Sequence, residues 1–289
     1  MKIISGSSNY NLAARISKIL DIEMLHTKIN HFGDGELNVR IDGNIGKEIM
    51  IVQSTSTPVN DHLMELLLLI DAVKRAGAEN ITAIIPYFGY SRQDRSKYKH
   101  EPISSSLVIK LIEAAGVTKV ITLDLHSSQV EGMFRVPVIN LLSSSIFFPA
   151  LEGKRDVMVV SPDIGGVARA RNYSSLLGSK LAIIDKVRDV NNVCSMGGII
   201  GDVRGKECVI VDDIIDGAST ICMATELLLK NGAKTVEAIV THPVFSGDAT
   251  SKIEKSGIQK IYISDSIFHD KLPEKFIIMP IAELIANVV

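Results

Sequence analysis

The chain has 289 residues, of which 46% are hydrophobic and 22% are charged. This composition supplies one large core or two moderate ones, and it excludes an intrinsically disordered chain. The 31 basic and 33 acidic residues give a net charge of −2, so no global positive field is available to bind a nucleic-acid backbone.

No segment predicts export or a membrane span. The first residues turn polar after Ile4, which leaves no room for the apolar core of a signal peptide. The longest apolar run, 63–70, contains Glu65 and is far shorter than the roughly 20 residues that cross a bilayer. The three cysteines lack metal-ligand spacing and are interpreted as reduced, mostly buried side chains. We therefore expect a cytoplasmic protein with neither a membrane nor a nucleic acid as partner.

Short apolar, β-branched runs alternate with amphipathic stretches along the chain. The runs are typical of parallel strands buried on both faces, and they cover 48–52, 81–85, 120–123, 157–160, 208–211 and 236–240. The helix-like stretches between them include 61–76, 104–115, 167–177 and 218–230. This alternation predicts an α/β fold in which helices flank a mostly parallel sheet.

An internal repeat divides the sequence. Residues 76–84 align with 231–239 at an offset of 155, and 46–52 align with 205–211 at an offset of 159. The four-residue difference between the two offsets falls in the turn that follows the first strand of each copy. Chance similarity between βα units is the alternative, but the matches are collinear. We predict two similar domains, 1–143 and 144–289, and the last helix could pack back on the first domain.

An acidic pair, Asp212 and Asp213, follows the strand of the second copy, and a turn of small residues then enters a helix. Backbone N–H groups at a helix start, beside the hydroxyls of Ser219 and Thr220, favour a phosphate. The two carboxylates can accept hydrogen bonds from the vicinal hydroxyls of a sugar. The pattern predicts a sugar-phosphate site, and an ordinary capped turn is the alternative. The first copy has the neutral residues 53–57 at this place.

Three further segments carry candidate chemistry. Arg92 and Arg95 suit phosphate oxygens, although a solvated loop has the same composition. His126 and Asp163 each follow a strand and could share a hydrated Mg²⁺ with phosphate oxygens, although a lone His is more often structural. Phe32 lies in a loop with two acids and two glycines, where it could stack on a purine or simply enter the core beneath a hairpin turn.

In chain order, these motifs resemble the ribose-phosphate pyrophosphokinase family over essentially the whole chain. The segments that carry the resemblance are 32–36, 90–95, 124–126, 161–167 and 212–220. The acidic loop alone is shared with all type I phosphoribosyltransferases. The resemblance implies two similar domains of the type I phosphoribosyltransferase fold. The chain is shorter than the commonest bacterial members, so it is similar to a short, archaeal-like group.

The resemblance implies that ATP gives its β,γ-diphosphoryl group to the 1-hydroxyl of ribose 5-phosphate, with Mg²⁺ as cofactor, leaving AMP. It implies a homo-oligomer with the ATP site near a subunit contact. Implied ATP-binding residues are Phe32, Asp34, Gly35, Glu36, Arg92, Gln93, Asp94 and Arg95. Implied ribose 5-phosphate-binding residues are Arg188, Asp212, Asp213, Asp216, Gly217, Ala218, Ser219, Thr220 and Ile221. The implied metal-linked residues are His126 and Asp163, and the implied catalytic residues are Lys186 and Arg188.

The sequence departs from the family at two loops. Val187 replaces an Arg and Asp189 replaces a Pro in the catalytic loop, whose following residues are polar and glycine-ended as in a mobile lid. In the phosphate loop, Gly217 stands where the family usually has Thr, and Ser219 stands where it usually has Gly. The hydroxyl lost at one position is offset by the one gained at the other. Two alternatives stay open: a phosphoribosyltransferase, which would not need Lys186, and a regulatory subunit, in which the catalytic motifs would be expected to be damaged.

Overall fold

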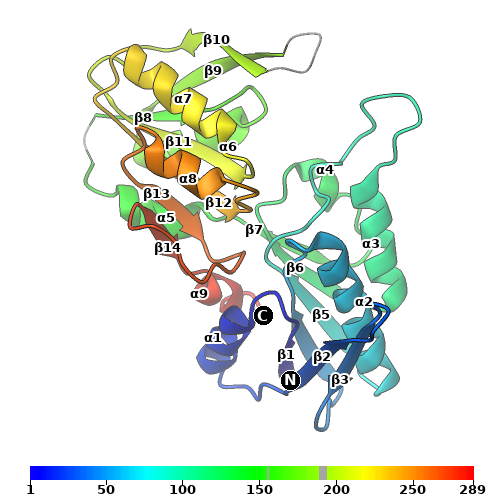
Figure 1. Ribbon diagram of the computed structural model, residues 1–289. Helices are drawn as coiled ribbons and strands as arrows, with labels where there is room; N and C mark the ends of the chain where they lie inside the picture. Colours follow the sequence, from blue (N-terminus) through cyan, green and yellow to red (C-terminus); the bar gives the residue numbers. More distant parts are fainter. Residues whose placement is uncertain (155, 189–193) are drawn as a thin grey trace. The chain divides into compact units, whose positions relative to one another are not determined.

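The computed structural model describes residues 1–154, 156–188 and 194–289, and within these ranges the side chains of 186–188 and 194–196 are left out. The chain forms two compact units (Figure 1). The first consists of Met1–Leu142, Ser266–Phe268 and Ile281–Val289, and the second of Ser143–Asp265 and His269–Pro280. Within the part of the chain that is described, no helix is both long and apolar enough to cross a membrane.

The first unit is built on a parallel sheet of five strands in the order β1-β4-β5-β6-β7. Its strands are β1 Lys2–Ser5, β4 Glu48–Val52, β5 Asn80–Ile85, β6 Lys119–Leu123 and β7 Val138–Leu141. An antiparallel hairpin is formed by β2 Thr27–His31 and β3 Leu37–Ile41. Its helices are α1 Tyr10–Leu20, α2 Val59–Arg75, α3 Ser104–Ala115, α4 Ser128–Glu131 and, from the end of the chain, α9 Ala282–Ala286.

Helices cover the sheet of the first unit because its strands are apolar on both faces. Ile49 and Ile51 of β4 pack in one cluster with residues of α2 and α3, whose apolar positions recur at helical spacing. Val39 and Ile41 of the hairpin pack against the same cluster. The short helix α9 packs on α1, as Figure 1 shows.

The second unit is built on a sheet of seven strands in the order β10-β9-β8-β11-β12-β13-β14, parallel except for β10. Its strands are β8 Val157–Ser161, β9 Lys180–Arg188, β10 Cys194–Ile200, β11 Glu207–Ile215, β12 Thr235–Pro243, β13 Ile261–Ser264 and β14 Phe276–Met279. Its helices are α5 Ser144–Leu151, α6 Val167–Leu177, α7 Ser219–Lys230 and α8 Ala249–Lys255.

Strand β11 shows how this sheet is buried between two layers of helices. Cys208 and Ile210 pack in a cluster with α7 and α8, whereas Val209 and Val211 pack in another with α5 and α6. Alternate residues of a strand point to opposite faces, so a run of apolar residues feeds both layers. The unit has three layers, with β11 near the middle of the sheet.

The internal repeat is matched by strand register. Glu48 lies opposite Asn80 in the first unit, and Glu207 lies opposite Thr235 in the second. These pairs are related by the same offsets, 159 and 155, as the sequence alignment. The turns also correspond, because Gly77 and Gly232 both have positive φ, at 94° and 87°. The duplicated βαβ unit predicted from the sequence is present in both units.

The α/β fold and the predicted core strands and helices are confirmed, and helices 104–115 and 167–177 have the predicted bounds. One detail was wrong. The sequence suggested that a strand ends at Asp212 and Asp213, but β11 continues to Ile215. Continued pairing with β12, as between Asp212 and Val240, holds the acidic pair inside the strand.

Candidate functional site

The acidic pair, Asp212 and Asp213, lies in the part of β11 that pairs with β12 but no longer with β8. Pairing between β11 and β8 stops at Ile210, whereas pairing with β12 continues past Asp212. The side chain of Asp213 is 5% exposed and that of Asp212 is 26% exposed. The pair is therefore fixed at the carboxyl end of the sheet, where ligand sites of α/β proteins form, and Asp212 is the member that solvent or a ligand can reach.

Arg169, in the first turn of α6, joins both carboxylates. Its Nη1 lies 3.2 Å from Oδ1 of Asp213 and 3.5 Å from Oδ1 of Asp212. Oδ1 of Asp212 also accepts the backbone N–H of Asp213 at 2.9 Å. The Asp212 side chain also hydrogen-bonds to that of Asp213, and its 26% exposure leaves part of it within reach of a ligand.

The two adjacent acids influence each other's ionisation. Burial raises the pKa of Asp212 well above its usual range, the charge of Asp213 raises it further, and Arg169 acts in the opposite direction. Asp163 contributes a smaller raising effect. The site therefore concentrates negative charge, which Arg169 partly compensates.

The predicted phosphate loop connects β11 to α7. Ala218 precedes the helix with φ 62° and makes no side-chain capping bond to α7. The first N–H groups of a helix are suited to an anion. The loop is braced from behind, because the N–H of Ser246 donates to the carbonyl of Asp216 at 3.2 Å. The predicted residues from Asp212 to Ile221 therefore form one continuous structure.

Asp163 lies in the same unit, in the loop between β8 and α6. Its Oδ1 accepts the N–H of Gly166 at 3.0 Å, and its Oδ2 has no partner among the described residues. An available carboxylate oxygen is a ligand that Mg²⁺ prefers. His126, the other metal-linked prediction, belongs to the first unit. Within the described ranges, no group of three or more metal-ligating side chains occurs.

In the first unit, Asp94 organises the predicted ATP-binding arginines. It accepts hydrogen bonds from Nε of Arg95 at 3.0 Å and from Oγ of Ser127, the residue after His126, at 2.6 Å. Burial alone would raise the pKa of Asp94, but these hydrogen bonds outweigh it and the pKa is lowered. The buried Asp94 thus joins the loop 92–95, called the arginine loop below, to Ser127, the residue next to His126. The side chain of Arg95 remains 65% exposed.

The other residues of this loop are placed by local contacts. Oε1 of Gln93 accepts a hydrogen bond from Ser104 Oγ at 2.6 Å, at the start of α3. The N–H of Gln93 donates to the carbonyl of Tyr90 at 2.9 Å, which forms the turn that contains Arg92. The side-chain oxygen of Gln93 therefore already has a partner within the protein.

The segment 32–36 forms the tip of the β2–β3 hairpin. Phe32 is 55% exposed, which rules out the alternative that it belongs to the core. The hydrogen bonds of the tip are internal: Phe32 N–H donates to the carbonyl of Glu36, and Asp34 accepts the N–H of Glu36. Gly35 has φ 93°, which suits the tight turn. The structure thus leaves an aromatic face and two carboxylates open, without joining them to the arginine loop.

The predicted catalytic residues Lys186 and Arg188 lie at the end of β9, opposite Met196 and Cys194 of β10. Their side chains lie outside the described residues, as does the predicted lid at 189–193. Gly197 and Gly198, expected at the end of the lid, belong to β10, where the register shifts between Met196 and Gly198.

The first unit carries a closed counterpart of the sugar-phosphate site. At the repeat offsets, Gln53 corresponds to Asp212 and Glu65 corresponds to Thr220. These two side chains hydrogen-bond to each other, with Nε2 of Gln53 2.9 Å from Oε1 of Glu65. A Cβ atom on Gly6 would lie only 2.2 Å from Gln53 Oε1 and 2.5 Å from Glu65 Oε1. The side chains of Gln53 and Glu65 therefore pack directly against the backbone at Gly6.

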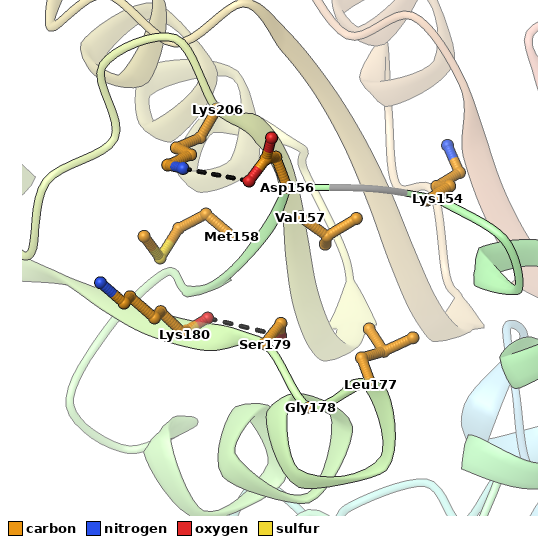
Figure 2. Close-up of a pocket in the computed structure, with 9 residues that line it drawn as sticks. All are labelled: Lys154, Asp156, Val157, Met158, Leu177, Gly178, Ser179, Lys180 and Lys206. Atoms are coloured by element: carbon orange, nitrogen blue, oxygen red, sulfur yellow. Dashed lines mark hydrogen bonds and ion pairs between the residues drawn. The ribbon is translucent and has the colours of Figure 1, made fainter.

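A pocket of about 240 Å³ lies at the opposite edge of the second unit's sheet, at the amino ends of β8 and β9 (Figure 2). Three lysines line it. Lys206 pairs with Asp156, and Lys154 pairs with Glu237 of β12 and points away from Lys180 in Figure 2. Because two of the three lysines are paired with acids and Lys154 lies apart from the other two, the pocket does not gather three free cations around an anion.

Sequence reasoning missed Arg169, Glu65 and Ser127. Arg169 stands three residues after the Gly-Gly of segment 161–166, in a helix that starts where β8 ends. A basic residue in the first turn of a helix is unfavourable to the helix dipole, and this was the available signal. Its acidic partners are more than forty residues away in the sequence, so only the fold could identify them.

Comparison with known proteins accounts for the whole chain. Residues 1–116 match the family described as the N-terminal domain of ribose phosphate pyrophosphokinase, and residues 136–276 match the phosphoribosyl transferase domain. The chain is 45% identical over 294 residues to the ribose-phosphate pyrophosphokinase of Thermosipho africanus, covering 100% of the chain and 93% of the relative. It is 46% identical over 291 residues to that of Helicobacter hepaticus, covering 100% and 94%. A crystal structure of phosphoribosylpyrophosphate synthetase from Mycobacterium smegmatis matches with a TM-score of 0.93 and 35% identity, over 99% of the chain and 96% of that structure.

Proposed function

The chain belongs to the ribose-phosphate pyrophosphokinase family, and from that premise we propose that it transfers the β,γ-diphosphoryl group of ATP to the 1-hydroxyl of ribose 5-phosphate. The products are phosphoribosyl pyrophosphate, a precursor for nucleotide biosynthesis, and AMP. The observation that carries this function is similarity along the entire chain, which includes the first domain that a simple phosphoribosyltransferase lacks.

The second unit binds ribose 5-phosphate. The carboxylate of Asp212, whose side chain is 26% exposed, accepts hydrogen bonds from the vicinal hydroxyls, and Asp213 stands beside it in the strand. The loop from Asp216 to Thr220 encloses the 5-phosphate, with N–H groups at the start of α7 as donors. Support comes from the continuity of these groups along one strand, one loop and one helix start.

The first unit binds ATP. The exposed ring of Phe32 stacks on the adenine, and Asp34, Gly35 and Glu36 complete the tip. Arg92 and Arg95 bind phosphate oxygens, with Gln93 beside them and Asp94 holding Arg95 in place. Lys186 and Arg188 supply positive charge to the β-phosphoryl oxygens as the loose transition state forms.

Mg²⁺ is the proposed cofactor, linked to His126 and Asp163. Asp163 fits this role because one carboxylate oxygen is available. The described residues supply fewer than three clustered ligands, so water and phosphate oxygens of the substrates complete the coordination. The bound ion neutralises charge on the ATP phosphates.

Three finer assignments accompany the function. We propose a homo-oligomer with the ATP site near a subunit contact, supported by the exposed apolar stripe Ile103, Leu107 and Leu111 along α3. We propose a cytoplasmic location, in keeping with the free thiols of Cys208 and Cys222. Membership of a short, archaeal-like group stays a prediction, because the relatives described above are bacterial.

The test is to incubate the purified protein with ATP, Mg²⁺ and ribose 5-phosphate and to follow nucleotides by ion-exchange chromatography and phosphorus NMR. We expect AMP in step with a new 1-diphosphate signal. ADP in place of AMP would contradict diphosphoryl transfer. Activity only with supplied phosphoribosyl pyrophosphate and a base would indicate a transferase, and silence in both assays would indicate a regulatory subunit.

The catalytic assignment is tested separately with Lys186→Ala. Loss of one group that stabilises transition-state charge should lower kcat by about 10²–10³-fold. Lys180→Ala is the matched control, because Lys180 is an exposed lysine at the start of the same strand. Equal activity of the two variants would refute the role of Lys186.

A further inference from the structure

Arg169 lies between the carboxylates of Asp212 and Asp213, the pair that the proposed function assigns to sugar binding. It projects from the first turn of α6, and its side chain is only 20% exposed. By strand alternation, Asp213 falls on the face that Val209 and Val211 present to α5 and α6. The fold therefore directs the more buried acid toward the helix that carries Arg169.

The contacts of Arg169 divide the oxygens of the acidic pair into two groups. Nη1 contacts Oδ1 of both Asp212 and Asp213. Oδ1 of Asp212 is fixed a second time by the backbone N–H of Asp213. With Oδ1 held twice, the Asp212 carboxylate has little rotational freedom, while its side chain stays 26% exposed and open to a ligand. A carboxylate held in this way is pre-organised to accept hydrogen bonds from a ligand.

Charge leads to the same conclusion. Ionisation of two adjacent acids of low exposure has a high free-energy cost unless a cation lies nearby. Asp163 is a third acidic group close enough to affect Asp212. Ribose 5-phosphate is itself an anion. A guanidinium between the acids reduces the repulsion that the incoming phosphate ester would meet.

We propose that Arg169 is a positioning residue for the sugar: by holding Oδ1 of each carboxylate, it fixes the partly exposed Asp212 in the orientation that meets the vicinal hydroxyls of ribose 5-phosphate. This inference rests on the proposed function. It assigns to Arg169 the recognition of ribose hydroxyls through Asp212, and it assigns no contact between Arg169 and the phosphate.

The experiment compares wild type, Arg169→Gln and Arg169→Lys, with Arg171→Gln as the matched control on the same helix, where the side chain is exposed. Calorimetry measures binding of ribose 5-phosphate and of 2-deoxyribose 5-phosphate, which lacks one of the vicinal hydroxyls. Steady-state kinetics measure KM for ribose 5-phosphate and for ATP. Thermal unfolding of each variant reports whether the fold is kept.

We expect Arg169→Gln to weaken ribose 5-phosphate binding by about 10- to 100-fold, the range for loss of charge-assisted hydrogen bonds, with KM for ATP changed less than about 2-fold. The preference for ribose over 2-deoxyribose 5-phosphate should shrink toward one. Arg169→Lys should restore part of both, since an ammonium keeps the charge but not the planar geometry. Arg171→Gln should match wild type.

Two outcomes would overturn the proposal. If both sugar phosphates weaken by the same factor, Arg169 acts on the phosphate and not through the hydroxyls. If Arg169→Gln folds and binds like wild type, Arg169 has no role in the site. Should Arg169→Gln fail to fold, the same comparison with Arg169→Lys decides. Failure of the proposed function is distinct, because wild type itself would then neither bind ribose 5-phosphate nor form AMP.

Discussion

Glu65 offers a quantitative test of the closed counterpart site in the first unit. It lies in α2 with 2% exposure, and both carboxylate oxygens are engaged. Oε1 accepts the N–H of Ser7 at 2.6 Å and Nε2 of Gln53 at 2.9 Å, and Oε2 accepts Oγ of Ser7 at 2.7 Å. The carboxylate thereby ties α2 to the loop after β1 and to the end of β4.

The expected cost of Glu65→Ala follows from these contacts. Three hydrogen bonds are lost, and the N–H of Ser7 and Nε2 of Gln53 lose an acceptor. Ser7 is exposed, so water can replace the acceptor of its N–H, whereas Gln53 is buried. A buried group left without its partner costs about 1–3 kcal/mol, so a loss of about 1–3 kcal/mol is expected. Glu65→Gln should cost less than about 1.5 kcal/mol, because its amide oxygen keeps the two Oε1 contacts and its NH₂ can donate to Ser7 Oγ.

Hydrogen exchange measured by mass spectrometry suits a chain with two units, because one global unfolding free energy is poorly defined there. Peptides from β1, β4 and α2 should lose protection in Glu65→Ala, whereas β11 and α7 in the other unit should not change. Glu79→Ala is the surface control, since the pair between Glu79 and Lys47 is about two-thirds exposed or more and is worth about 1 kcal/mol or less.

Two results would refute this reasoning. Full protection in Glu65→Ala would show that the network contributes no stability. A second equivalent of ribose 5-phosphate bound per chain, in wild type or in Glu65→Ala, would show that the first unit retains a functional site. We expect calorimetry to give one equivalent per chain in both.

Three further outcomes are expected. Asp94→Asn should lower the melting temperature at neutral pH; because the pKa of Asp94 is lowered in the folded state, its stabilisation is full above pH 4 and is lost as the pH falls further, so the difference from wild type should shrink there in pH-dependent thermal scans. Burial raises the pKa of Cys208 to about 11, so iodoacetamide at pH 8 should modify it only after denaturation, as read by intact-mass spectrometry. Ala218→Val should raise KM for ribose 5-phosphate and lower stability by about 1–2 kcal/mol, because a β-branched residue is disfavoured at φ 62°, whereas Ala218→Gly should stay close to wild type in both assays.

Much of the fold could be predicted because it depends on local patterns. Runs such as 157–160 are apolar at every position, so they indicate strands covered on both faces, and β8 has that burial. The repeat predicted two similar units, and the pairs Glu48–Asn80 and Glu207–Thr235 have equivalent register in the two sheets. The weaker elements were not predicted: β13 and β14 have four residues each, too few to show periodicity.

The candidate site could be predicted only where its residues are contiguous. The acids and hydroxyls of the predicted sugar-phosphate site lie in one segment, from Asp212 to Thr220. In the structure this segment forms the end of β11, a short loop and the start of α7. Arg169 and Ser127 act through partners distant in sequence, at Asp213 and Asp94, so no spacing rule could reveal them. The end of β11 was misplaced because carboxylates are rare inside buried strands. Here the missing β8 pairing and the contact with Arg169 make them tolerable.

The two units show how one duplicated framework can bind different ligands. Both keep a strand, a turn, a helix and a second strand in equivalent register, so the backbone alone does not determine what is bound. In the second unit, the partly exposed Asp212 precedes the loop that leads to the start of α7. In the first, Gln53 and Glu65 stand at the corresponding places and satisfy each other. Because Gln53 and Glu65 satisfy each other's hydrogen-bonding groups, these buried side chains need no ligand to do so. Their hydrogen bond stabilises the first unit. The proposed ATP-binding residues of the first unit accordingly lie outside the turn of the repeat, at the hairpin tip with Phe32 and in the loop 92–95.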